Sequence, residues 1–348
     1  MSHRFLTSAS IPTVIAVAML APVPVAAQPA SPQAPSAAKA WTPPRTADGR
    51  PDLQGVWDYR TITPLERPAA LGTKAFFTDE EAAKYEQQEN GRQNRDLIDP
   101  KVGGLNYPAG GVVPYNEFWY DRGNKIVGTK RTSLIVDPPD GRLPPLTPAG
   151  EAKAKRRAEI GRQEQLGHPL ADSWEDRPLA ERCILGANAG PPMTPGAYNN
   201  NFQLVQTPDT VVIVNEMIHE ARVVPMDGRP HLGIPQWKGD SRGHWDGDTL
   251  VVDTTNFKRE TSLPGSSSSM HLTERFTRTG PDALLYEFTV DDPSTWTKPW
   301  TAAVPTSRID VPVYEYACHE GNYAMTGILA GARADEKAMA DAAKKAAK

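Results

Sequence analysis

The sequence from position 243 to position 257 reads Gly243-His244-Trp245-Asp246-Gly247-Asp248-Thr249-Leu250-Val251-Val252-Asp253-Thr254-Thr255-Asn256-Phe257. Asp-Gly between two strand-like runs is a strong signal for a tight hairpin, because glycine accepts the positive φ angle that the turn requires. The residues after it are rich in Val and Thr, whose branched side chains suit a pleated surface. We therefore predict a turn at Asp246–Asp248 and a strand from Thr249 to Phe257, with Asp253 on the face of Val251.

Similar strand-like runs occupy most of the chain after position 200, and short turns such as Pro208-Asp209 separate them. The predicted strands are Phe202–Thr207, Thr210–Val224, Trp245–Phe257, Met270–Thr279, Ala283–Val290, Trp300–Arg308 and Val313–Cys318. Consecutive strands joined by short turns form an antiparallel sheet, and such a sheet hides its edges best by closing on itself. The expected fold is all-β, an antiparallel and lipocalin-like β-barrel with long wrapping loops.

Two peripheral helices are expected outside the barrel. Thr78 and Glu81 form a capping box that starts a polar helix running to about Asn94, and a second helix is predicted from Thr147-Pro148 to Gln165. Between them lies an aromatic cluster, Tyr115–Arg122, which is either the wall of a ligand pocket or a loop anchored by apolar side chains, and we favour the anchor. Residues 44–330 are interpreted as a single domain that includes N-terminal and middle wrapping segments, and residues 331–348 as a polar tail.

The first 27 residues have the pattern of a signal peptide. Arg4 supplies the positive charge, Ile11–Leu20 the apolar stretch, and Val25-Ala26-Ala27 the small residues of a cleavage site. Residues 28–43 are rich in Ala, Pro and Ser and are expected to be a disordered tether. We therefore expect a periplasmic or secreted protein with no membrane association after cleavage.

Charge and cysteine content narrow the classes of partner. The 38 basic and 42 acidic residues give a net charge of −4 without a basic stripe, so we expect no nucleic-acid partner. The chain has 2 cysteines, Cys183 and Cys318, and in an oxidising compartment a pair is most simply one structural disulfide. Free thiols or soft metal ligands are the alternatives.

Three motifs carry a resemblance to a known family. Pro51–Trp57, Gly243–Phe257 and Tyr314–Tyr323 together resemble a family of exported bacterial proteins of unknown function. Within the first motif, Gly55-Val56-Trp57 is similar to the Gly-x-Trp that opens the first strand of lipocalins, although a core tryptophan on any first strand gives the same pattern. The resemblance implies export and one continuous unit, and it assigns no catalytic residue.

Candidate site residues are polar side chains that alternation places on apolar faces. The candidates are Glu274, Asp253, His219 and Glu320. If these faces point into a barrel, one His and three carboxylates meet in an apolar pocket, where burial raises the pKa of a carboxyl group as general acid–base catalysis requires. The structural alternative is that the buried carboxylates pair with arginines such as Arg222, Arg275 or Arg308.

Metal and cofactor sites have weaker signals. A metal could be gathered by His219, His244, His271 and His319 with Glu274 or Glu320, although no HExxH or Cys-x-x-Cys motif is present. No phosphate-binding or dinucleotide fingerprint occurs, so no cofactor is expected.

The leading hypothesis is an exported, cofactor-independent enzyme that performs acid–base chemistry, as a lyase, isomerase or hydrolase, on a small organic or glycosidic molecule. One alternative is a periplasmic β-barrel that binds an apolar or aromatic small ligand. The other is a non-catalytic accessory subunit.

Overall fold

The computed structural model describes residues 41–104, 109, 116–165, 170–186, 188–259, 261 and 263–347. Residues from Trp41 onward form one compact unit. The predicted signal peptide and most of the predicted tether lie outside the described residues. Within the described ranges, no helix is both long and apolar enough to cross a membrane.

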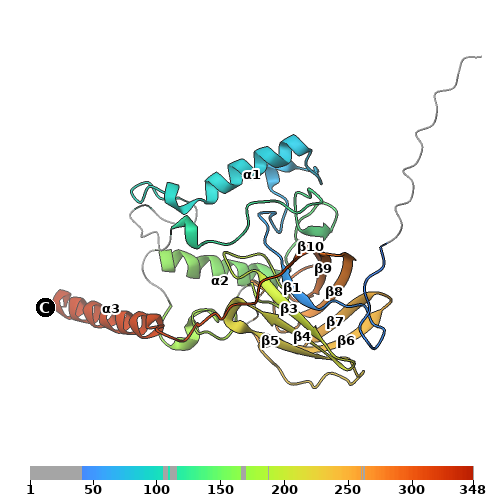
Figure 1. Ribbon diagram of the computed structural model, residues 1–348. Coiled ribbons are helices and arrows are strands. Elements are labelled where there is room, and N and C mark those ends of the chain that lie inside the picture. Colours follow the sequence, from blue (N-terminus) through green and yellow to red (C-terminus); the bar gives the residue numbers. More distant parts are fainter. Residues whose placement is uncertain are drawn as a thin grey trace, which may run out of the picture. The chain divides into compact units, whose positions relative to one another are not determined.

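The described part of the chain forms one 10-stranded antiparallel sheet (Figure 1). Its order is β5-β4-β3-β1-β10-β9-β8-β7-β6, and β2 pairs with β10 beside this path. The expected all-β, antiparallel fold is confirmed at this level. The strands are β1 (Gly55–Asp58), β2 (Ile135–Asp137), β3 (Asn201–Gln206), β4 (Thr210–Asn215), β5 (Ala221–Pro225), β6 (Asp240–Asp246), β7 (Thr249–Thr255), β8 (His271–Gly280), β9 (Ala283–Asp291) and β10 (Trp300–Ile309).

The predicted hairpin at Asp246–Asp248 joins β6 to β7. Asp246 pairs with Thr249, and Gly247 has the positive φ of 58° that the turn needs. The strand ends at Thr255 rather than at Phe257, because Asn256 has a φ of 57° and leaves the extended conformation.

Two predicted strands are wrong. The run Thr210–Val224 is broken into β4 and β5 by a 3₁₀ turn at Met217–His219, where Ile218 and His219 have φ angles of 57° and 43°. Met217 and Ile218 of this turn are buried in a small separate apolar cluster. Their apolar side chains continue the pattern of the flanking strands, so the sequence pattern does not indicate the turn. The run Val313–Cys318 contains no strand.

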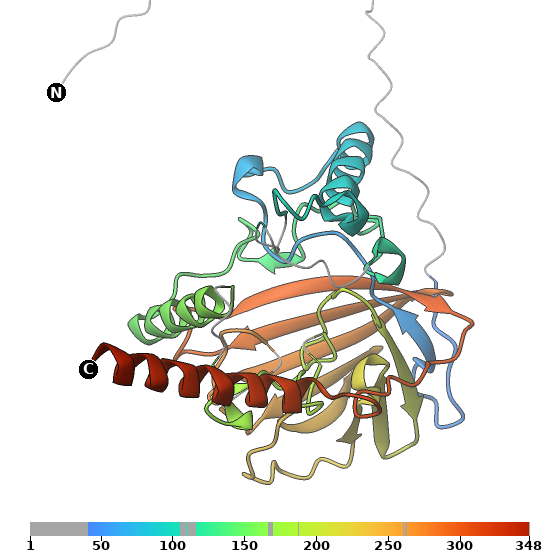
Figure 2. The same cartoon turned by 90° about the vertical axis from the view of Figure 1, so that its left-hand side faces the viewer.

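The sheet is not closed into a barrel, so the closed, lipocalin-like barrel is not confirmed. The terminal strands β5 and β6 share no ladder among the described residues, although they approach each other through side chains. A Cβ atom on Gly243 of β6 would lie 2.9 Å from Val224 Cγ1 and 2.3 Å from Met226 Sδ. Figure 2 shows the resulting strong curvature of the sheet.

Aromatic and aliphatic side chains fill the inner face of this curved sheet. Cross-strand register places alternate residues of most strands on that face, and burying each large apolar side chain contributes about 1.5–3 kcal/mol. The Gly- and Pro-rich loop before β3 adds Met193 to the same core. The interior therefore has a packed core, whose largest members include Trp57, Phe202, Phe276, Tyr286, Phe288 and Trp300.

The helices are α1 (Asp79–Gln93), α2 (Pro148–Gln165) and α3 (Ala324–Ala346), one more than expected. Thr78 and Glu81 form the predicted capping box at the start of α1. A small apolar cluster of Ile62, Phe77, Ala82 and Ile126 holds α1 against the loops that follow β1 and the aromatic segment. The C-terminal helix α3 is tied to the remainder by Arg333, which donates to the backbone oxygens of residues 171 and 172.

Replacing Gly243 by Ala is expected to lower the free energy of unfolding by about 1–3 kcal/mol, because the new methyl group would lie 2.9 Å from Cγ1 of buried Val224, whose branched side chain has few rotamers. Urea denaturation measures this change. Gly161→Ala on α2 is the control for an unobstructed methyl group, because a Cβ there meets nothing within 4 Å, and it should be stabilising by up to about 1 kcal/mol because alanine favours a helix. Equal stability of the Gly243→Ala variant and the wild type would show that β5 and β6 are not packed together.

Candidate functional site

The structure does not bring the predicted site residues together. Glu274 lies on the inner face, fully buried, where its carboxylate forms a two-point ion pair with Arg222 of β5. Tyr286 Oη donates to Glu274 Oε1 at 2.7 Å and accepts from the backbone N of Met193 at 3.0 Å. The carboxylate, the guanidinium group and the phenol all have hydrogen-bond partners. This arrangement corresponds to the structural interpretation, in which a buried carboxylate pairs with an arginine.

The pKa directions agree with a charged Arg222. Burial, the largest single influence, lowers the pKa of Arg222, but the charge of Glu274 and its hydrogen bonds to the guanidinium, with a smaller contribution from Tyr286, together raise that pKa above its usual value. Burial, and then the charge of Glu274, raises the pKa of Tyr286, so this phenol stays a neutral donor.

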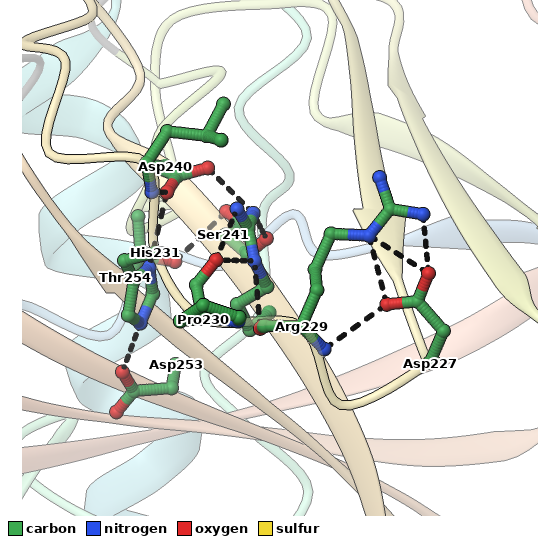
Figure 3. Close-up of polar contacts among 10 residues, drawn as sticks. Asp227, Arg229, Pro230, His231, Asp240, Ser241, Asp253 and Thr254 are labelled. Atoms are coloured by element: carbon green, nitrogen blue, oxygen red, sulfur yellow. Dashed lines mark hydrogen bonds and ion pairs between the residues drawn. The ribbon is translucent and has the colours of Figure 1, made fainter.

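Asp253 lies on the opposite face of the sheet from Glu274. Asp253 pairs with Thr273 and its neighbour Val252 pairs with Glu274, so alternation sends the two carboxylates to different faces. His231 Nε2 lies 3.0 Å from Asp253 Oδ1, and His231 Nδ1 lies 3.3 Å from Asp240 Oδ2 (Figure 3).

His271 Nε2 contacts the other oxygen of Asp253. Asp240 also accepts the backbone N–H of Leu232 at 2.6 Å, and Arg242 donates to the carbonyl of Pro230 at 2.9 Å. This polar network fastens residues 226–239 to the outer face.

His219 and Glu320 lie elsewhere. His219 is exposed in the turn between β4 and β5, and its Nδ1 lies 3.0 Å from the carbonyl oxygen of Tyr316. Glu320 is exposed in the irregular segment before α3. Within the described ranges no group of His, Cys, Asp or Glu has the geometry of a metal site.

The disulfide between Cys183 and Cys318 is present, with a Cα–Cα distance of 5.7 Å. It ties the segment before α3 to the middle of the chain rather than to a last strand.

The aromatic segment Glu117–Arg122 borders three surface pockets. Phe118 and Trp119 are 83% and 65% exposed, so these rings do not anchor the loop in the core, in contrast to the expectation from the sequence. Tyr115 lies outside the described residues. The segment therefore corresponds to the other interpretation, in which it is the wall of a pocket.

Hydrogen bonds position this segment against α1. Glu117 accepts from the backbone N–H of Arg95 at 2.9 Å, and Arg122 donates to Glu117 and to the carbonyl of Gln93. On its other side the backbone N–H of Asp121 donates to the carbonyl of residue 197 at 2.9 Å. The wall is thus held between the C-terminal end of α1 and the loop before β3.

One pocket beside this wall has a volume of about 640 Å³ and is lined by more guanidinium groups than the other two. We call it the arginine pocket. The guanidinium groups of Arg95 and Arg122 lie over the ring of Tyr120, with Cζ-to-centroid distances of 5.3 and 4.7 Å. Its other walls are residues 61–65 and 194–197. The charged and aromatic lining residues are Tyr85, Glu89, Arg92, Arg95, Tyr120 and Arg122.

The electrostatics of the arginine pocket favour anions. Hydrogen bonds from Arg92 hold the pKa of Glu89 below its usual value, so this carboxyl group is ionised at neutral pH and is not a proton donor. Burial, and then the charge of Glu89, raises the pKa of Tyr85, which stays a neutral hydrogen-bond donor. The lining contains three arginines and one carboxylate, and Glu117 beside the pocket supplies a second carboxylate, which pairs with Arg122.

Sequence reasoning missed these arginines because they lie on a polar helix and beyond its end. The polar sequence of α1 predicts that Arg92 is exposed to solvent. No local spacing in the sequence relates Arg92 to Arg122. The aromatic cluster was the signal that pointed to this region.

Comparison of the chain with protein-family models, with curated proteins and with solved structures finds no match. The resemblance of its motifs to an exported bacterial family therefore stays a prediction.

Replacing Glu274 by Gln is expected to lower the free energy of unfolding by about 3–5 kcal/mol, because it leaves the charge of Arg222 buried and unpaired. The double variant Arg222→Met/Glu274→Met removes both charges and should lose less. Urea denaturation of the single and double variants measures the difference. An unchanged stability of Glu274→Gln would contradict a structural role for this carboxylate.

Replacing His231 by Ala is expected to loosen residues 226–239, because it removes the contacts to Asp240 and Asp253. Hydrogen–deuterium exchange should become faster in this loop, with little change in the inner strands. His244→Ala on the exposed face of β6 is the control. Unchanged exchange in the loop would show that His231 does not fasten it.

Proposed function

We propose that the protein is an exported binding protein for a small planar anion, such as an aromatic carboxylate, held in the arginine pocket. The observation that carries this proposal is a cavity of about 640 Å³ whose lining includes three arginines, two of them over the ring of Tyr120. Cavities of this size are typical of sites for small organic ligands.

Guanidinium groups match the geometry of a carboxylate, because they donate two parallel hydrogen bonds to its two oxygens. The partly buried ring of Tyr85, which lines the pocket, is the aromatic surface proposed to contact the flat body of an aromatic ligand. The hydroxyl groups of Thr61 and Thr63 lie along the same wall, although both are engaged in backbone contacts. A charged head and a flat body are therefore both accommodated.

Binding is favoured over the acid–base enzyme that the sequence suggested. That mechanism needs two carboxyl groups with separated pKa values in one pocket. Glu274 is committed to Arg222 on the inner face, and Asp253 lies on the outer face. The lowered pKa of Glu89 suits a counter-charge for an arginine and not a general acid.

The proposed ligand site lies in a different place from the ligand site of a lipocalin. A lipocalin-like barrel holds its ligand inside the barrel, but here large side chains fill the inner face. The proposed pocket lies outside, between α1 and the wrapping segments. Export to the periplasm or the medium is part of the proposal and depends on the signal-like residues 1–27.

Naphthoate should bind the mature protein in isothermal titration calorimetry, and its neutral amide, naphthamide, should bind much more weakly. Arg92→Gln is expected to weaken naphthoate binding about tenfold, the effect of losing one charged hydrogen bond. Arg162→Gln on α2 is the matched control, because Arg162 forms the same pair with a glutamate three residues earlier but lies outside the pocket.

Equal binding of naphthoate and naphthamide would contradict an anion site. An equal loss of affinity in the Arg92→Gln and Arg162→Gln variants would show that net charge, and not this pocket, decides the binding.

A further inference from the structure

A second pocket lies on the other side of the aromatic segment and has the opposite charge. Its volume is about 380 Å³, and we call it the tyrosine pocket. It shares no lining residue with the arginine pocket. Its lining residues are Trp119, Asp121, Tyr198, Asn199, Glu216 and Tyr316.

Glu216 supplies a buried negative charge to this pocket. The residue is 5% exposed, and its two carboxylate oxygens accept hydrogen bonds from Asn199 at 2.6 Å and Asn201 at 2.9 Å. Amide donors orient a carboxylate but do not neutralise it, and among the described residues no Lys, Arg or His forms an ion pair with Glu216.

Asp121 adds to the negative character. Its only ion pair among the described residues is with Arg60, and that guanidinium also pairs with Asp58. One cation thus serves two carboxylates, and the charge of Glu216 comes in addition.

Three aromatic rings complete the lining. Tyr198 and Tyr316 lie nearly parallel, with an interplanar angle of 14° and a centroid distance of 6.4 Å. Trp119 is 65% exposed, so packing in the core does not explain why an indole ring is at this position. The faces of such rings are electron-rich and attract cations.

Distant parts of the chain hold these rings in place. The disulfide fixes Cys318, two residues after Tyr316, and the carbonyl of Tyr316 is contacted by His219. Asn188 donates to the carbonyl of Tyr198 at 2.9 Å. Ala189, Met217 and Ile218 form the apolar floor against which both tyrosines pack.

We infer that the tyrosine pocket binds a small organic cation through its aromatic rings and the Glu216 carboxylate, with a quaternary ammonium group as the best-suited chemistry. A weakly hydrated ammonium group gains from aromatic faces, whereas a hard metal ion requires several converging oxygen ligands. The described residues provide no such metal group. This inference is independent of the anion site, because the two pockets have separate linings.

The test is calorimetric titration of the mature, oxidised protein with choline and with dimethylbutanol, the neutral carbon analogue of choline. Choline is expected to bind saturably and dimethylbutanol much more weakly. Trp119→Ala should weaken choline binding about fivefold, the scale of one cation–π contact. Trp174→Ala is the matched control, because Trp174 is also a half-exposed tryptophan in a 3₁₀ turn but does not line this pocket.

Glu216→Gln tests the charge, and it should reduce choline binding at least as much as Trp119→Ala does. If this buried substitution prevents folding, choline binding by the exposed Trp119→Ala variant is sufficient to test the inference. Absence of saturable choline binding, equal binding of dimethylbutanol, or an equal loss in Trp174→Ala would overturn the inference. Naphthoate titration of the same variants separates it from the anion site, since Trp119→Ala should leave that affinity unchanged.

Discussion

The buried ion pair between Arg222 and Glu274 joins the edge strand β5 to β8 in the opposite half of the sheet. These strands are far apart in the hydrogen-bonded order, so the pair forms only if the sheet curves until its inner face meets itself. Leaving one of these charges buried without its partner would be costly, so the pair is compatible only with a sheet that curves enough to bring β5 and β8 together. The pair and the curvature of the sheet are therefore coupled.

The same curvature decides where ligands can bind. Because the inner face is filled by large rings and by Met193 from the preceding loop, the interior offers no room comparable to that of a ligand-binding barrel. The wrapping segments instead form pockets outside the sheet. The aromatic segment Glu117–Arg122 stands between two of them, with arginines on one side and carboxylates on the other. This separation of charge along one wall underlies both proposed ligand classes.

Part of this arrangement was predictable from local sequence. The hairpin at Gly247, the capping box at Thr78 and the pairing of Cys183 with Cys318 all appear as predicted. The candidate site was not predictable in the same way. Asp253 and Glu274 were grouped because each shares a face with apolar residues, yet both faces of β7 carry apolar residues and only one points inward.

The sequence by itself determined the secondary structure class, the turns and the covalent link, because side-chain alternation, glycine in a tight turn and helix capping act between residues a few positions apart. Only the tertiary structure decided that the sheet stays open, that Glu274 is matched with Arg222, and that Arg92, Arg122 and Glu216 border pockets. The physical reason is that twist and curl accumulate over many strands, so the contacts between distant residues depend on the sum of all pairings and not on any one stretch.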